Sequence, residues 1–192
     1  MLIGMSGFKG SGKDTVGAYL VKEHGFERRA FGDKIKQSVA ALMDIPYEAI
    51  EKWKNEPDVC VTIHDTEVPG SCYAQQTFRS FLQKFGTESH RDVFGDDFWV
   101  NALLPVGGFY AGRAIVITDC RFKNEFERIK TLGGFVVRVD RFQNPWEAHR
   151  SELEFLDWVP DMILKNNGTT EQLFIAVETM LSELGVLSYN DG

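Results

Sequence analysis

The sequence contains few cysteines and no long apolar run. Its three cysteines, Cys60, Cys72 and Cys120, form no C-x-x-C pair, which argues against both a disulfide framework and a zinc site. The first apolar run covers residues 1–5 only, and no later stretch approaches the ~18 apolar residues that a membrane-spanning helix requires. These absences predict a soluble cytoplasmic protein with reduced thiols and no membrane partner.

Basic residues are also scarce. Lysine and arginine together number 21 against 28 aspartates and glutamates, and the formal net charge is −7. Such a balance argues against general binding to nucleic acid backbones or anionic membranes, so a bound phosphate would need a local basic site. With 192 residues, of which 43% are apolar, the chain is expected to form a single domain over residues 1–192.

Apolar runs alternate along the chain with segments of helical periodicity. Strands are expected at residues 2–6, 26–31, 114–118, 135–140 and 162–165. Helices are expected at residues 13–24, 33–43, 75–92, 96–106, 121–132 and 170–184. This order predicts an α/β fold in which a five-stranded parallel sheet carries helices on both faces.

Two segments depart from this alternation. Residues 44–74 contain several prolines around a hairpin expected at residues 59–68, and we interpret them as an insertion on the acceptor side. Residues 141–161 lie between the fourth and fifth expected strands and combine prolines, tryptophans and charges of both signs. That position and composition suit a lid.

Residues 7–13, G-F-K-G-S-G-K, lie between the first expected strand and the first expected helix. They fit the pattern G-x-x-x-x-G-K in the strand-to-helix context that it needs. Glycines let backbone N–H groups point at phosphate oxygens, the helix N-terminus favours an anion, and Lys13 can reach the β- and γ-phosphates. The alternative, a flexible turn, would not require this spacing.

Asp14 stands where such a loop usually has Ser or Thr, whose hydroxyl contacts magnesium. Thr15 follows and can supply a hydroxyl instead. An aspartate beside phosphates is repelled unless a cation intervenes, so Asp14 either holds Mg²⁺ or caps the helix by accepting backbone N–H bonds. Both alternatives stay open, and Asp14 and Thr15 are the metal candidates.

The segment Gly-Ser-Gly-Lys-Asp-Thr at residues 10–15 resembles the P-loop of phage deoxynucleoside monophosphate kinases of the bacteriophage T4 type. The related phosphomevalonate kinases of animals share Gly-Lys-Asp. Further similarity to the phage family follows in order along the chain: Ile35-Lys36, R-x-x-L-Q-x-x-G-T-E at residues 79–88, D-x-R at residues 119–121 with Glu125 downstream, H-x-x-E at residues 149–152, and N-x-G-T at residues 166–169. The stretch at residues 79–88 favours a nucleotide acceptor over mevalonate.

The resemblance implies a P-loop kinase that uses Mg²⁺ and transfers the γ-phosphoryl group of ATP to a deoxynucleoside monophosphate. It implies catalytic roles for Lys13, Arg121 and Arg150. The residues expected to bind ATP are Gly10, Ser11, Gly12, Lys13, Asp14, Thr15, Asn167 and Gly168. The residues expected to bind the acceptor are Lys9, Ile35, Lys36, Arg79, Gln83, Thr87, Glu88, Asp119, Arg121 and Glu125. Small nucleotides are the expected partners, no nucleic acid polymer is expected, and a homodimer is left open.

Helical spacing bears on several of these residues. Arg79 and Gln83 are four residues apart and share a helix face, so a guanidinium for a phosphate and an amide for a base edge can point the same way. The aromatic and leucine residues of the same segment recur at offsets of three and four, so they are expected to form a buried stripe. The stripe comprises Phe78, Phe81, Leu82 and Phe85.

Simpler structural roles compete with some of the expected site roles. Lys36 could be a solvated lysine, and Asp119 could be an ordinary helix N-cap followed by a first-turn arginine. Thr169 could equally be a helix N-cap. His149 is expected to be structural, because a phosphate acceptor is already anionic and needs no general base.

Two rival functions remain at this stage. Another small-molecule kinase, such as a phosphomevalonate kinase, would have no use for Gln83 or for residues 86–88. A non-enzymatic nucleotide-binding switch would respond to the γ-phosphate but would lack a second phosphate pocket. Acceptor-dependent turnover distinguishes the three.

Overall fold

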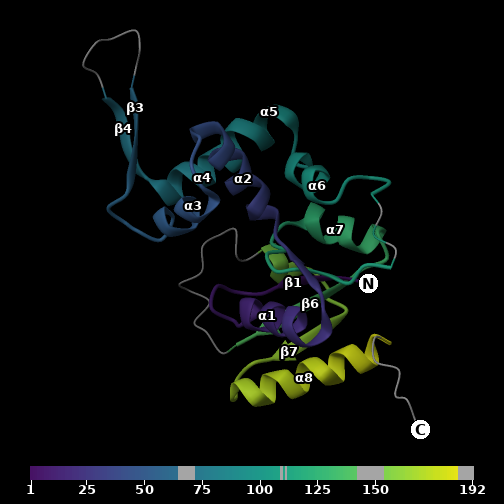
Figure 1. Cartoon of the computed structure of the whole chain (residues 1–192). Coiled ribbons are helices and arrows are strands. Elements are labelled where there is room, and N and C mark those ends of the chain that lie inside the picture. The colour runs from purple at the N-terminus through teal and green to yellow at the C-terminus, as the bar shows by residue number, and fades with distance from the viewer. Residues whose placement is uncertain (65–71, 109, 111, 142–153, 186–192) are drawn as a thin grey trace. The chain divides into compact units, whose positions relative to one another are not determined.

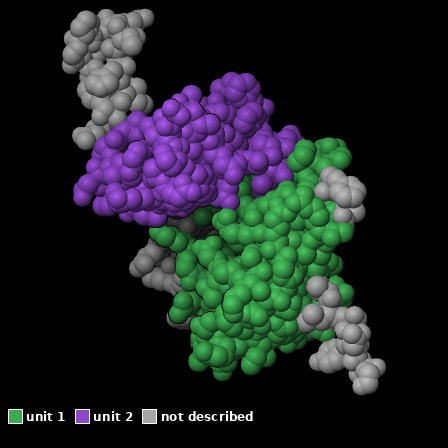
Figure 2. Space-filling model, in the orientation of Figure 1, with its two compact units in different colours: residues 1–31, 104–192 green, residues 32–103 purple. Residues whose placement is uncertain are grey.

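The computed structural model describes residues 1–64, 72–108, 110, 112–141 and 154–185. The described chain divides into two compact units (Figure 2): residues 1–31 with 104–192 form unit 1, and residues 32–103 form unit 2. Among the described residues, no helix combines the length and the apolar character needed to cross a membrane.

Unit 1 is built on a five-stranded sheet whose strands follow the order β2-β5-β1-β6-β7, and all of its pairs are parallel (Figure 1). The strands are β1 (Leu2–Ser6), β2 (Glu27–Arg29), β5 (Ile115–Ile117), β6 (Phe135–Asp140) and β7 (Met162–Lys165). The helices that accompany them are α1 (Lys13–His24), α7 (Lys123–Thr131) and α8 (Thr170–Glu183), with a short 3-10 helix η4 (Glu154–Asp157). The expected α/β fold with a five-stranded parallel sheet is confirmed.

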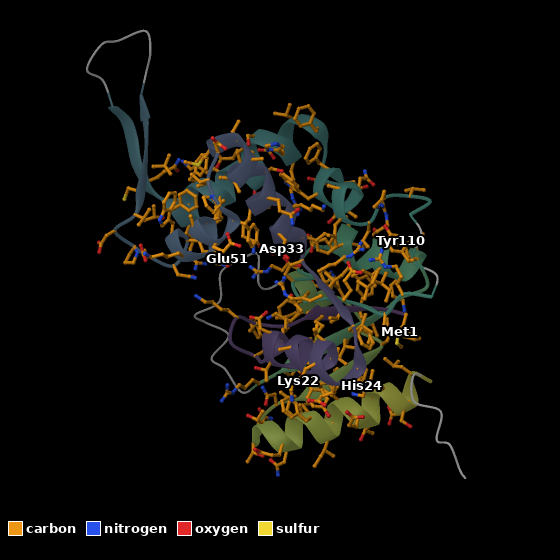
Figure 3. The ribbon with its side chains drawn as sticks, in the orientation of Figure 1. Met1, Lys22, His24, Asp33, Glu51 and Tyr110 are labelled. Atoms are coloured by element: carbon orange, nitrogen blue, oxygen red, sulfur yellow. The ribbon has the colours of Figure 1, made fainter. Side chains whose placement is uncertain are left out.

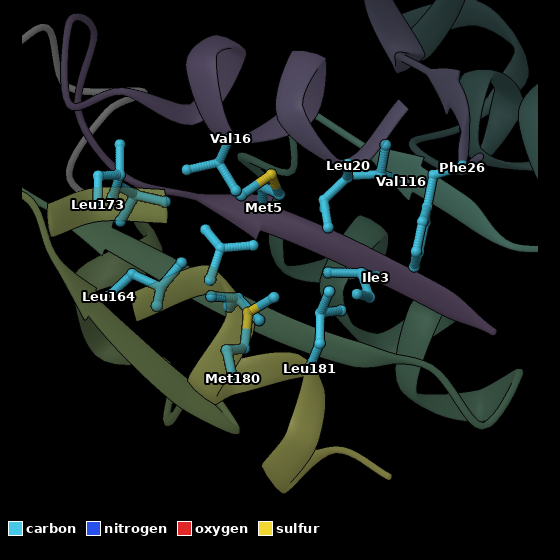
Figure 4. Close-up of a cluster of buried hydrophobic side chains, with 13 residues drawn as sticks. Ile3, Met5, Val16, Leu20, Phe26, Val116, Leu164, Leu173, Met180 and Leu181 are labelled. Carbon is cyan, nitrogen blue, oxygen red and sulfur yellow. The ribbon is translucent and has the colours of Figure 1, made fainter. Parts of the chain in front are cut away.

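The central strand β1 is buried on both faces, and its alternating side chains contact different helices. Ile3 and Met5 join a core cluster with Val16 and Leu20 of α1 and with residues of α8 (Figure 4). Gly4 points the opposite way, where a Cβ would lie 2.4 Å from Cδ1 of Ile129 in α7. Helices α1 and α8 therefore cover one face of the sheet, and α7 covers the other.

Unit 2 consists of helices and one two-stranded antiparallel sheet. Its elements are α2 (Phe31–Met43), which begins at the last residue of unit 1, α3 (Tyr47–Trp53), β3 (Cys60–His64), β4 (Cys72–Thr77), α4 (Phe78–Gly86), a π-helix η1 (Thr87–Arg91), α5 (Asp92–Phe94) and α6 (Phe98–Leu103). Val39, Ala40, Ile50 and Phe78 form a buried cluster in this unit, against which the partly buried Phe81, Leu82 and Phe85 pack. The expected buried stripe of α4 is thereby confirmed.

Several expected elements have the bounds that the structure gives them. Residues 2–6, 135–140 and 162–165 are strands, and residues 13–24 are a helix. The other helices and strands of unit 1 are one to three residues shorter than expected at their ends, as helix and strand termini commonly are.

The predictions for residues 44–92 were partly wrong. The helix expected from residue 75 begins at Phe78, because residues 72–77 pair with β3 and the Thr77 side chain accepts a hydrogen bond from the backbone N–H of Ser80 at 3.2 Å. Its second half is a π-helix. The hairpin expected at residues 59–68 has its second strand at residues 72–77 instead, and α3 was not predicted at all.

Two further bounds differ. The strand expected at residues 26–31 is confined to Glu27–Arg29, because the backbone N–H of Phe31 donates to Oδ1 of Asp119 at 2.8 Å and α2 begins at Phe31. The helix expected at residues 96–106 is confined to Phe98–Leu103, because Pro105 and Gly107 follow it.

Candidate functional site

The loop between β1 and α1 has a backbone that only glycine adopts easily. Gly7, Gly10 and Gly12 have φ values of 132°, 79° and 107°. A Cβ at Gly7 would lie 2.4 Å from the backbone oxygen of Val139, and one at Gly12 would lie 2.4 Å from Nδ2 of Asn166. Conformation and close packing therefore both require glycine at positions 7 and 12.

Lys13 is the first residue of α1, and its side chain folds back over this loop. Lys13 is 9% exposed, and its Nζ donates to the backbone oxygens of Gly7 and Phe8, each at 2.6 Å. The ammonium group is thus fixed at the mouth of the loop, at the N-terminus of a twelve-residue helix whose N-cap, Gly12, offers no side-chain bond. Both features favour an anion at this point.

A cavity of about 250 Å³ opens beside Lys13. Its lining residues are Gly10, Gly12, Lys13, Asp14, Thr15, Arg141, Asn166, Gly168, Thr170 and Leu173. Ser11, within the same loop, is 1% exposed, and its Oγ has no hydrogen-bond partner in the described part of the chain. Because a buried hydroxyl without a partner is costly, the loop fits a bound group that brings acceptor oxygens, such as a polyphosphate.

Asp14 and Thr15 are exposed residues in the first turn of α1, and both line the cavity. The capping alternative for Asp14 finds no hydrogen bond among the described residues, where the N-cap position belongs to Gly12. No group of three or more His, Cys, Asp or Glu side chains suited to a metal occurs in the described ranges. A cation here would therefore need phosphate oxygens or water to complete its ligands.

Asn166 connects the last strand to the phosphate loop. Its backbone N–H donates to the oxygen of Asp140 at 2.7 Å, and its Nδ2 donates to the backbone oxygen of Ser11 at 2.8 Å. The next residues differ in their position: Gly168 lines the cavity, and Thr169 caps α8 by accepting from the N–H of Gln172 at 3.3 Å. The N-cap alternative for Thr169 is therefore confirmed.

The end of β5 holds another group of predicted residues. Oδ1 of Asp119 accepts from the N–H of Phe31 at 2.8 Å, and Glu125, 2% exposed, accepts from the N–H groups of Arg121 and Phe122 at 2.8 and 3.1 Å. Both carboxylates therefore hold the backbone, whereas the side chain of Arg121 is exposed. The parallel strands β1, β5, β6 and β7 all end at this edge of the sheet, the edge at which ligands bind in such folds.

In unit 2, Lys36 is held by carboxylates. Its side chain is 13% exposed and Nζ lies 2.6 Å from Oδ1 of Asp33, with Glu51 and Tyr47 beside it. Burial alone would lower the pKa of Lys36, but the bonds to Asp33, Glu51 and Tyr47 outweigh it and raise that pKa above its ordinary value. The alternative of a solvated lysine does not hold.

Arg79 is an exposed residue of α4, and its side chain reaches the residues that follow α3. Its Nε donates to the backbone oxygen of Lys54 at 3.2 Å, and Nη2 donates to Oδ1 of Asn55 at 2.9 Å. Gln83 is exposed four residues further along α4, while Thr87 and Glu88 begin the π-helix.

Ile35 packs on Gly86, where a Cβ would lie 2.6 Å from its Cδ1. Lys9 is exposed within the phosphate loop of unit 1. Arg150 and the expected H-x-x-E segment lie outside the described residues.

Relatives of known name match most of this chain, although no protein-family model matches it. A protein of Acanthamoeba polyphaga mimivirus named deoxynucleotide monophosphate kinase is 31% identical over an alignment of 193 residues, which covers 91% of this chain and 92% of the viral protein. This chain belongs to the deoxynucleotide monophosphate kinase family. A second family member, from Escherichia phage RB69, is 26% identical over an alignment of 146 residues, which covers 73% of this chain and 54% of the phage protein. The resemblance found in the sequence is confirmed.

Solved structures align with the kinase along most of its length but at low similarity. TT1252 from Thermus thermophilus gives a TM-score of 0.48 at 18% identity, covering 96% of this chain and 97% of its own. Shikimate kinase from Aquifex aeolicus gives a TM-score of 0.45 at 16% identity, covering 96% and 97%. Because these scores are low, the family assignment depends on the mimivirus relative.

Two residues at the cavity beside Lys13 were not predicted from the sequence. Asn166 was part of the recognised N-x-G-T segment, but its bond to the phosphate loop joins positions that are 155 residues apart. Arg141, the first residue of the expected lid, is exposed and lines the cavity. Its place directly after the fourth expected strand was the signal available for it.

The bond from Asn166 gives the kinase a first testable expectation. Asn166→Ala removes the donor that holds the Ser11 carbonyl, so the KM for ATP should rise several-fold, in keeping with a hydrogen bond worth about 1 kcal/mol. Asn166→Asp should be worse, because a carboxylate would face a carbonyl oxygen and the incoming phosphates. Initial rates at varied ATP test this, with the adjacent Lys165→Ala as control; an unchanged KM for ATP in both Asn166 variants would contradict the role.

Glu125 gives a second expectation, which concerns stability. Glu125→Ala leaves the partly buried N–H groups of Arg121 and Phe122 without their acceptor, so the free energy of unfolding should fall by about 2 kcal/mol. Denaturant unfolding followed by circular dichroism measures the change. Glu127→Ala on the same helix is the control, because its carboxylate is 60% exposed and lies 3.7 Å from Nζ of Lys123. Equal unfolding free energies in the two variants would contradict the role of Glu125.

Proposed function

We propose that this protein transfers the γ-phosphoryl group of ATP to a deoxynucleoside 5′-monophosphate, which yields ADP and a deoxynucleoside diphosphate. The observation that carries the proposal is the phosphate loop of residues 7–15, with its buried Ser11 hydroxyl and fixed Lys13, in a chain that belongs to the deoxynucleotide monophosphate kinase family. The nucleotide kinase function follows from that family membership.

The donor is proposed to bind in the cavity beside α1. Backbone N–H groups of Gly10, Ser11, Gly12, Lys13, Asp14 and Thr15 would surround the phosphates, and Lys13 would move from the loop carbonyls to the β- and γ-phosphates. Asn167 and Gly168 are proposed to contact the base. Mg²⁺, held through Asp14 and Thr15 with water and phosphate oxygens, would neutralise charge on the phosphates when bound.

The residues proposed to bind the acceptor are those that the family resemblance implies. In this proposal the two units belong to one kinase domain, and Lys9, Lys36, Arg79 and Arg121 bind the acceptor phosphate. The remaining proposed acceptor residues are Ile35, Gln83, Thr87, Glu88, Asp119 and Glu125. Asp119 and Glu125 would act through the backbone that they hold, since their carboxylates accept backbone N–H bonds.

The chemistry asks for position and charge rather than for a base. A phosphate acceptor is anionic at neutral pH, so the kinase needs to align the two phosphates and to neutralise the charge between them. Arg121 and the proposed lid arginine Arg150 would stabilise charge on the phosphoryl group in transfer. A lid over residues 141–161 would exclude water and thereby prevent hydrolysis of ATP.

The partners proposed are small nucleotides, in the cytoplasm of the cell where the protein is made. An acceptor panel tests the function: ADP formation is followed with ATP and Mg²⁺ and with each deoxynucleoside monophosphate, each ribonucleoside monophosphate or phosphomevalonate offered separately. Stimulation by deoxynucleotides is expected. Stimulation by phosphomevalonate alone would show that the proposed acceptor is wrong. ADP formation that no acceptor changes would favour a non-enzymatic nucleotide-binding switch.

A further inference from the structure

The carboxylate of Glu51 in α3 receives three donors from its own unit. Nζ of Lys36 and the hydroxyl of Tyr47 both reach Oε1, the latter at 3.1 Å, while Nζ of Lys54 reaches Oε2. Figure 3 labels Glu51 and also Asp33, the second carboxylate that contacts Lys36. Two ammonium groups and a hydroxyl thus converge on one anionic group. Proteins hold a phosphate with the same kind of arrangement.

The four charged side chains of this cluster differ in their exposure. Lys36 and Asp33 are 13% and 15% exposed, whereas Lys54 and Glu51 are 27% and 35% exposed. Asp33 therefore contacts Lys36 on the more buried side of the cluster, where Oδ1 of Asp33 also accepts a hydrogen bond from the Tyr47 hydroxyl at 2.9 Å. Glu51 is the outermost anion and the one that a solvent-borne anion could replace.

Arg79 of α4 is a third cation near this cluster, because its side chain bonds Lys54 and Asn55, the two residues that follow α3. Both of its hydrogen-bond acceptors, the Lys54 carbonyl and the Asn55 side chain, are neutral oxygens that cancel none of its charge. Two of the residues predicted for the acceptor phosphate, Lys36 and Arg79, thus both contact α3 or the residues that directly follow it. Lys54, which the sequence did not single out, lies there with them.

The contacts of Lys36 and Lys54 shift the pKa of Glu51. Burial would raise the pKa of Glu51, but the bonds from Lys36 and Lys54 outweigh it and lower that pKa to about 2. Glu51 is therefore a full anion at any pH at which a kinase works. In the absence of another anion it balances two lysines that would otherwise lie charged and close together.

We propose that Glu51 is a resident anion in a phosphate subsite of unit 2, and that the phosphate of the acceptor competes with it for Lys36 and Lys54. Lys54 is then a further ligand of the acceptor phosphate. The proposal rests on the proposed function for the identity of the anion. A phosphate dianion displaces the carboxylate because it brings more charge and a third oxygen, and the displaced Glu51 is exposed enough to turn to solvent.

Two variants test the competition in opposite directions. Glu51→Gln removes the resident charge without changing its size, so the KM for the acceptor should fall roughly tenfold, the effect of one charge-assisted hydrogen bond. Lys54→Gln removes a phosphate ligand, so the KM for the acceptor should rise by about the same factor. Neither variant should change the KM for ATP.

Lys52→Gln is the matched control, because Lys52 lies on the same helix with a side chain 72% exposed, 3.8 Å from Glu56 and outside the cluster. A KM for the acceptor that Glu51→Gln leaves unchanged or raises would overturn the proposal. So would a Lys54→Gln enzyme that behaves like Lys52→Gln. Thermal unfolding of each variant verifies that it is folded, and Lys54→Gln keeps the test decisive if Glu51→Gln does not fold.

Calorimetric titration of the full chain with inorganic phosphate separates this proposal from the proposed function. Because the phosphate loop is the same in all variants, any difference between them reports the subsite of unit 2. Tighter phosphate binding in Glu51→Gln and weaker binding in Lys54→Gln support the subsite even if no deoxynucleotide stimulates turnover. Equal binding in wild type and both variants would overturn it even if the kinase reaction is confirmed.

Discussion

Lys13→Ala is expected to lower kcat by at least ~10²-fold while the protein stays folded. The Lys13 ammonium is fixed directly on the phosphate loop by two bonds, to Gly7 and Phe8, and the proposed reaction places it on the γ-phosphate as charge develops there. Alanine keeps the first turn of α1, since it is the best helix former. The hydrophobic core that holds α1 depends on Val16 and Leu20 instead.

The measurement for Lys13 is ADP formation at saturating ATP and acceptor, together with thermal unfolding. Lys22→Ala is the control, because Lys22 is on the same helix with a side chain 81% exposed and bonds only Glu23. A Lys13→Ala protein with kcat near that of Lys22→Ala would contradict the role of the loop. Loss of the folded state in Lys13→Ala alone would show that Lys13 supports the loop rather than the reaction.

Arg79→Ala is expected to raise the KM for the acceptor by roughly 10- to 100-fold and to leave the KM for ATP unchanged. A guanidinium on a phosphate makes charge-assisted hydrogen bonds worth about 1.5–3 kcal/mol, which is the basis of that range. The bonds of Arg79 to Lys54 and Asn55 are exposed, so their loss should cost little stability. They hold the guanidinium at the end of α3 before the acceptor binds.

Initial rates at varied acceptor and at varied ATP separate the two KM values for Arg79→Ala. Lys84→Ala on the same helix removes an exposed positive charge and serves as the control. If Arg79→Ala has the same two KM values and the same kcat as Lys84→Ala, the acceptor site is not on this face of α4. The proposed subsite at Glu51 would then also lose its third cation.

Much of unit 1 could be predicted because its elements are determined locally. The strands β1, β6 and β7 are short apolar runs bounded by turn residues, and α1 begins at a glycine-rich loop and ends at Gly25 in the left-handed conformation. The phosphate loop was recognisable because its function depends on spacing within seven residues. These features depend on neighbouring residues in the sequence and little on distant parts of the chain.

Unit 2 was predicted less well because distant partners decide its elements. Residues 72–77 alternate too weakly to separate from a helix, and only their pairing with β3 makes them a strand. Helix α3 has seven residues and follows Pro46, too short a segment for periodicity to identify it. The hydrogen bonds of the π-helix at Thr87–Arg91 span five residues instead of the four of an α-helix, and no general sequence pattern predicts this.

The candidate site divides in the same way. Lys13, Asp14, Thr15 and Gly168 were predicted and line one cavity. Asn166 and Lys54 were not assigned a role, because their partners Ser11 and Glu51 are known only from the folded chain. In the proposed subsite, the second of these pairs concerns the acceptor.

The most direct test of the central claim follows the phosphoryl group itself. ATP radiolabelled in its γ-phosphate is incubated with the protein, Mg²⁺ and each deoxynucleoside monophosphate, and the products are separated by chromatography. The account predicts that the label appears in a deoxynucleoside diphosphate, with an equal amount of ADP. Label that stays in ATP or appears only as inorganic phosphate, with every deoxynucleotide offered, would contradict it.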